Sequence, residues 1–174
     1  MKPNFVFYRL ITFILLPIAG LNAISIIGTI PAALGNPLML IGVFINFAII
    51  AYTFTSFIFF IRGILSDKPQ KASLKDWIKV NAFVTIFYSG FILLAAAIYL
   101  SSPQMQKMAA DNYPKLKEAM GPQAVDKETF LKFLHWGLIF FGGYSALLLT
   151  HVIITLRLLK KYASLFVPGS NNSR

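Results

Sequence analysis

Four apolar runs, each long enough to cross a bilayer, constrain the fold of this chain more than any other feature. They cover residues 10–30, 38–61, 77–100 and 134–159. A helix needs about 20 apolar residues to span ~30 Å of hydrocarbon. None of the runs has Asp, Glu or Lys in its central part, and none alternates as a membrane β-strand does. The sequence therefore predicts an all-α integral membrane protein built as a four-helix bundle.

The connections between these runs predict how the spans follow one another. Residues 31–37 are short and uncharged, so we expect a tight turn and antiparallel first and second spans. Residues 62–76 form a polar and basic loop. We expect residues 1–165 to make a single four-span domain and residues 166–174, which are mostly small and polar, to be a frayed tail.

The longest connection, residues 101–133, carries helix start and stop signals. Ser102 precedes Pro103, which is the usual order of an N-cap and a first helical residue. Gly121-Pro122 is a stop signal, and Asp126 can cap a second helix that continues into the fourth span. The sequence thus predicts a partly helical loop between the third and fourth spans.

Basic residues predict the orientation, because short cytoplasmic flanks are enriched in Lys and Arg. The loop 101–133 holds five basic and four acidic residues. The opposite side holds eleven basic residues: Lys2, Arg9, Arg62, Lys68, Lys71, Lys75, Lys79, Arg157, Lys160, Lys161 and Arg174. We therefore expect both termini to be cytoplasmic and the loop 101–133 to be extracytoplasmic. Trp77 and Trp136, with Tyr8, Tyr99 and Tyr162, are expected to form the interfacial aromatic belt.

The net charge of +10 indicates an anionic partner. The basic residues flank apolar runs and do not line a polar face, which favours the headgroups of the lipid bilayer over nucleic acid. The cluster between the second and third spans is a candidate contact for anionic lipid: Lys68, Lys71, Lys75 and Lys79. The positive-inside rule, by which basic residues set the orientation of a membrane protein, explains the same cluster without any specific binding of lipid.

Polar residues recur at helical spacing inside the spans. The candidates for buried polar layers are Asn22, Asn46, Thr53, Asn81, Thr85, Tyr88, Tyr144 and His151. By their depth along the helices, Asn22, Asn46, Tyr88 and Tyr144 are expected near the midplane, and the other four are expected in the cytoplasmic half. We expect Asn22, Asn46, Thr85 and His151 to face the bundle interior, either as hydrogen-bonding contacts between helices or as part of a hydrated path.

Catalytic chemistry has little support in the sequence. There is no cysteine, and the two histidines, His135 and His151, lie about 24 Å apart along one predicted helix, too far to share a metal. No embedded carboxylate is present to relay protons with His151. No HExxH, GxSxG, Walker or dinucleotide-binding motif occurs. The sequence predicts a protein that is not an enzyme, with no catalytic residues, no cofactor and no metal site.

Two functional classes fit a small multi-pass membrane protein of this kind. The first is a structural or interaction role, such as an accessory or assembly subunit of a membrane complex, with a protein partner or self-association. The alternative is an oligomeric channel or transporter that uses the polar stripes of the four helices. A continuous polar path to water would favour the alternative, whereas closure of the polar layers by Phe and Leu would favour the first.

Overall fold

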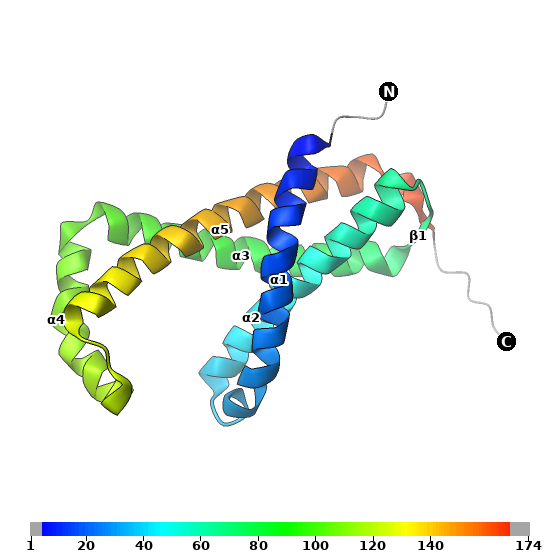
Figure 1. The fold of residues 1–174 in the computed structure, drawn as a ribbon. Helices are drawn as coiled ribbons and strands as arrows, with labels where there is room; N and C mark the ends of the chain where they lie inside the picture. The colour runs from blue at the N-terminus through cyan, green and yellow to red at the C-terminus, as the bar shows by residue number, and fades with distance from the viewer. Residues whose placement is uncertain (1–4, 168–174) are drawn as a thin grey trace. The chain divides into compact units, whose positions relative to one another are not determined.

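The predicted all-α membrane architecture is confirmed. A computed structural model describes residues 5–167, apart from the side chains of residues 123 and 167. Within that part, four helical segments are long and apolar enough to span a membrane. They are α1 (Val6–Ala33), α2 (Pro37–Ile58) with its extension η1 (Phe59–Leu65), α3 (Ala72–Ser101) and α5 (Lys127–Lys161) (Figure 1). Each span extends beyond both ends of the predicted apolar run, by one residue at the start of α2 and by seven at the start of α5.

The turn between α1 and α2 is shorter than the predicted 31–37. Pro31 lies inside α1, and Pro37 is the first residue of α2. Asn36 caps α2, since its side-chain oxygen accepts hydrogen bonds from the backbone N–H groups of Leu38 and Met39. The cap and the proline together fix the point at which the second span begins.

The second span ends in a π-helical segment that the sequence analysis did not predict. In η1 the carbonyl of Ile61 accepts the N–H of Ser66, five residues on, at 3.2 Å. Gly63 lies in this segment, and a Cβ there would come within 3.1 Å of the Phe59 ring. A short connection follows, after which β1 (Gln70–Lys71) pairs in parallel with β2 (Phe166–Val167). The pairing covers the first two residues of the predicted tail, and residues 168–174 lie outside the described part of the chain.

The predicted helix in the long loop is confirmed, together with its caps. α4 (Pro103–Met120) begins after Ser102, whose hydroxyl accepts the N–H of Met105 at 3.3 Å. It ends at Gly121, which adopts φ 62°, a conformation that favours glycine. The short 3-10 turn η2 (Gly121–Gln123) follows, and α5 then begins behind Asp126 and runs unbroken into the fourth span.

The chain divides into two compact units. Unit 1 takes the described residues up to Tyr88 and from Leu147 onward, and unit 2 takes Ser89–Ala146. Unit 1 contains the main core, where α1, α2, η1, the first half of α3 and the second half of α5 meet. Its largest fully buried side chains include Tyr52, Phe59, Phe60 and Leu148. The 3-10 turn η3 (Ala163–Leu165) precedes β2, and Phe166 stacks on Phe59 with ring centroids 5.3 Å apart.

Unit 2 contains α4 and the adjoining halves of α3 and α5. Gly142 on α5 allows a close approach to α3, because a Cβ at this position would lie 3.3 Å from that of Ala96. Tyr113 on α4 is buried, donates a hydrogen bond to the carbonyl of Val125 and packs against the Phe130 ring. These contacts fix α4 to the start of α5 within the unit.

Candidate functional site

The buried polar centre of unit 1 is built around His151. Its ring is fully buried on α5, and both nitrogens have partners from other helices. Nε2 lies 3.0 Å from Thr12 Oγ1 on α1, and Nδ1 lies 2.7 Å from Tyr52 Oη on α2. The Tyr8 ring stacks on the imidazole with a centroid separation of 4.6 Å and an interplanar angle of 11°. Thus His151 joins three spans.

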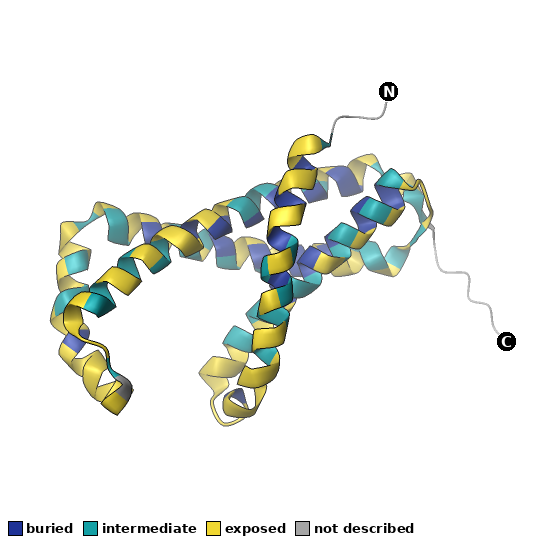
Figure 2. Ribbon diagram, in the orientation of Figure 1, coloured by how far each residue is buried: buried dark blue, intermediate teal, exposed yellow. Residues whose placement is uncertain are grey.

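Thr155 completes this group, one helical turn after His151. Its Oγ1 lies 3.0 Å from Tyr8 Oη and 2.9 Å from Tyr52 Oη. We call the five residues the histidine cluster: Tyr8, Thr12, Tyr52, His151 and Thr155. All are buried. Most buried positions of the hairpin lie in the first half of α1 and the second half of α2, whereas the turn between the two helices is largely exposed (Figure 2).

Each hydroxyl in the histidine cluster has one proton, so the donors can be assigned in turn. Thr12 donates to the backbone carbonyl of Tyr8 at 2.7 Å, so it must accept from His151 Nε2–H. In a neutral imidazole Nδ1 then accepts the proton of Tyr52. Thr155 in the same way donates to the backbone carbonyl of His151 at 2.8 Å and accepts from Tyr8, while its oxygen also lies 2.9 Å from Tyr52 Oη. The donors thus form two short chains, one from Tyr8 through Thr155 to the His151 carbonyl and one from Tyr52 through the His151 ring and Thr12 to the Tyr8 carbonyl, and every proton is used once.

The other three polar residues that were predicted for the cytoplasmic half are buried, but they form hydrogen bonds within their own helices. Thr53 donates to the carbonyl of Ile49, Asn81 to that of Trp77, and Thr85 to that of Asn81. Thr85 is fully buried and Asn81 nearly so. Such bonds to the preceding turn satisfy the side chain without joining helices. His151 differs from these three residues, because its hydrogen bonds to Thr12 and Tyr52 join different helices.

The predicted midplane residues fall into both units. Asn22 and Asn46 are half-buried in unit 1 and line a hollow of about 220 Å³ between α1 and α2. The rest of its lining is made by the polar Ser25 and Thr29, by Gly42 and by the apolar Ile26, Met39 and Val43. Tyr88, half-buried, ends the α3 part of unit 1, and Tyr144 is buried in unit 2.

Sequence reasoning missed three members of the histidine cluster. Tyr8 was expected in the interfacial belt, but it is 3% exposed and stacked on His151. Thr12 and Tyr52 were not singled out. One available signal was the buried α1 stripe Tyr8–Thr12–Leu15–Ala19, which continues at helical spacing into Asn22. Extending the polar stripe of the first span toward its N-terminus would have found Tyr8 and Thr12.

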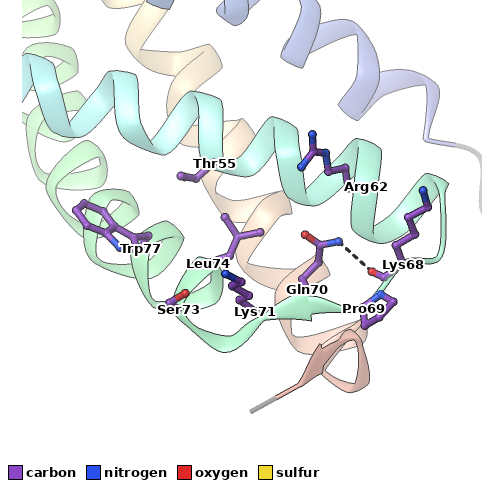
Figure 3. A pocket seen from close by; sticks show the side chains of 9 residues that line it. All are labelled: Thr55, Arg62, Lys68, Pro69, Gln70, Lys71, Ser73, Leu74 and Trp77. Carbon is purple, nitrogen blue, oxygen red and sulfur yellow. Dashed lines mark hydrogen bonds between the residues drawn. The ribbon is translucent and has the colours of Figure 1, made fainter. Parts of the chain in front are cut away.

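The four lysines predicted as a lipid contact line two different hollows. Lys68 and Lys71, with Arg62, line an open recess of about 580 Å³ beside Trp77. Figure 3 shows the charged ends of these three side chains lying apart from one another, while the Gln70 amide donates to the Lys68 carbonyl. Lys75 and Lys79 line a second groove, of about 640 Å³, between α3 and α5. The sequence cluster is thus split between two hollows of unit 1.

No family model, no curated protein and no solved structure matches the chain. The class of this protein is therefore inferred from its own fold. Four apolar helices of spanning length define a multi-pass integral membrane protein.

Proposed function

We propose that this chain is a non-enzymatic interaction protein of the membrane, acting as an accessory or assembly subunit or by self-association. We propose that its contact surface inside the bilayer is the polar hollow of the α1–α2 hairpin. The observation that carries the proposal is that this hollow presents polar side chains at the depth of the hydrocarbon core.

The hydrogen bonding of the two asparagines supports a protein partner at the hollow. The Asn46 amide donates to the Gly42 carbonyl at 3.0 Å, and the Asn22 side chain has no hydrogen-bond partner among residues 5–167. An unsatisfied polar group in hydrocarbon costs several kcal/mol, and acyl chains offer it no partner. A neighbouring helix with a polar or small face satisfies such groups and packs closely beside Gly42.

The histidine cluster supports a structural role for the remaining polar residues. A catalytic base needs a nitrogen within reach of the proton that it removes, whereas both ring nitrogens of His151 are buried and already hydrogen-bonded within the cluster. The residues beyond the hollow also favour contact over conduction. Toward the core of unit 1 the polar lining gives way to Leu15, Ala19 and Ile49, which are 0–3% exposed. A conducting pore requires a polar or hydrated lining along its length.

The proposal is tested by removing the polar groups of the hollow. The double variant Asn22→Leu/Asn46→Leu retains the helices and loses both amides. Native electrophoresis of membranes solubilised in mild detergent should give an assembly larger than a single 19.4-kDa chain for the wild type and a single chain for the double variant. Asn112→Leu, the same change on exposed α4, serves as the control and should leave the assembly intact. A wild-type chain that migrates alone, or a double variant that assembles normally, contradicts the proposal.

A further inference from the structure

The groove between α3 and α5 in unit 1 combines concentrated positive charge with an apolar wall. Two lysines of α3, Lys75 and Lys79, face Arg157 and Lys160 of α5 across it. None of the residues that line the groove is acidic. The four cations come from two helices. They are therefore brought together by the packing of the spans and not by their spacing along the sequence.

The apolar wall of the groove continues from the charges toward the middle of the span. Ile153, Leu156, Arg157 and Lys160 recur at three- and four-residue intervals, so they share one face of α5. From Lys160 to Ile153 the helix rises about 10 Å. Ile153 is 48% exposed, which leaves an apolar surface uncovered next to the basic end.

The position of Lys75 is held by an aromatic contact. Its Nζ lies 5.7 Å from the centroid of the Phe166 ring, within cation–π range. Phe166 belongs to β2, which pairs with β1 just before α3 begins. The strand pairing therefore places an aromatic ring under a cation at the mouth of the groove.

We propose that this groove is a binding site for an anionic phospholipid of the surrounding bilayer. The phosphate contacts Lys75, Lys79, Arg157 and Lys160, and the first part of an acyl chain lies along Leu156 and Ile153. Free phosphate matches the charge but leaves the apolar wall uncovered, whereas a phospholipid matches both. The inference goes beyond the proposed interaction role and does not depend on it, because it concerns other helices and other residues.

The experiment compares two lipids that differ in headgroup charge and share their acyl chains. Native mass spectrometry of the full chain in neutral detergent measures the retention of added phosphatidylglycerol and phosphatidylcholine. We expect preferential retention of phosphatidylglycerol. The variant Lys75→Gln/Lys79→Gln should bind it at least about tenfold more weakly, from the contribution of a basic residue near an anionic headgroup, with no change for phosphatidylcholine.

Two matched controls separate the groove from general surface charge. Lys68→Gln/Lys71→Gln removes the same charge from the neighbouring recess and should stay within about twofold of the wild type. Lys160→Gln should weaken binding, whereas Lys161→Gln, one residue further on and outside the groove, should not. A thermal melt of each variant in detergent checks that these exposed or half-exposed substitutions leave the fold intact.

Three results would overturn the inference. The first is equal retention of both lipids by the wild type. The second is an equal loss in the groove variants and in their controls, which would assign the attraction to diffuse charge. The third is complete displacement of phosphatidylglycerol by millimolar inorganic phosphate, which would show that the apolar wall contributes nothing.

Discussion

At the scale of single residues, the cost of burying His151 is offset by its partners. A buried polar group without a hydrogen bond is strongly unfavourable, and His151 has bonds from α1 and α2 together with the stacked Tyr8 ring. The burial of His151 could be predicted from the sequence, because a polar residue inside an apolar span favours the protein interior. The identity of its partners could not, because the periodicity of one helix does not give the rotation of another about its own axis.

Replacing His151 by leucine tests the contribution of these bonds. His151→Leu removes both interhelical hydrogen bonds of the ring and leaves Thr12 bonded to the Tyr8 carbonyl. We expect the free energy of unfolding to fall by about 1–2 kcal/mol, measured by denaturant titration in detergent. His135→Leu, the same substitution at a half-buried site of unit 2, should change it by less than about 0.5 kcal/mol. An equal loss of unfolding free energy in the two variants would show that the histidine cluster contributes no more to stability than an isolated half-buried histidine.

The donor assignment in the histidine cluster makes a spectroscopic prediction. Because Thr12 uses its proton on the Tyr8 carbonyl, His151 must carry hydrogen on Nε2. Nitrogen-15 NMR of the detergent-solubilised protein should therefore show the neutral Nε2–H tautomer. In Thr12→Val, which cannot accept a hydrogen bond, the preference for this tautomer should weaken. A dominant Nδ1–H form in the wild type would contradict the assignment and would mean that Thr12 donates to His151 Nε2 and that His151 donates to Tyr52.

At the scale of elements, local signals predicted the boundaries that local chemistry determines. Ser102, Gly121 and Asp126 mark the ends of α4 and the start of α5, because a cap is recognised from a few adjacent residues. The π-helical turn of η1 was not predictable in this way. Its five-residue bonding pattern accompanies the close approach of Phe59 and Gln70 to Gly63, and the position of Gln70 is set by pairing with a strand at the far end of the chain.

The cap of α5 carries a pH dependence that can be measured. Asp126 accepts bonds from the hydroxyl and the backbone N–H of Thr129, which hold the pKa of its carboxyl below the ordinary aspartate range. The ionised group therefore stabilises the helix start fully above the ordinary pKa, and the effect is lost as the pH falls through the lowered pKa. Hydrogen exchange at the first turn of α5 should accelerate on acidification in the wild type. The Asp126→Asn variant, whose cap does not ionise, should lack this acid-dependent step, and identical pH profiles would refute the assignment.

At the scale of the whole molecule, the four spans and the helix between the last two could be predicted because both depend on the length of apolar runs and on caps. The division into two units could not, because it depends on which halves of α3 and α5 pack with α1 and α2. The polar residues of the spans could likewise be predicted only in part. Their presence inside the membrane was predictable, whereas the separation into a satisfied histidine cluster and an open hollow is a property of the packed helices.

The orientation remains a prediction from the distribution of basic residues, and the absence of cysteine makes it simple to test. A single cysteine at Ala110 on α4 should react with a membrane-impermeant maleimide in intact cells. A single cysteine at Ser73, beside the basic recess, should react only after permeabilisation. The reverse pattern would place both termini outside and would move the α3–α5 groove to the opposite leaflet.

The most direct test of the central claim, that polar residues in the spans make contacts between helices, is a photo-crosslinking scan of α1 through the proposed contact. Benzoylphenylalanine, which reacts with C–H bonds of any neighbour, would replace single residues from residue 21 to residue 29, and crosslinked products would be measured after irradiation of the native membrane. The account predicts strong crosslinking to a neighbouring protein at the positions that line the hollow, Asn22, Ser25 and Thr29. It predicts weak crosslinking at Leu21, Ile24 and Ile27, which are 69–72% exposed and expected to face lipid. Crosslinking that is absent throughout, or strongest at the lipid-facing positions, would contradict it.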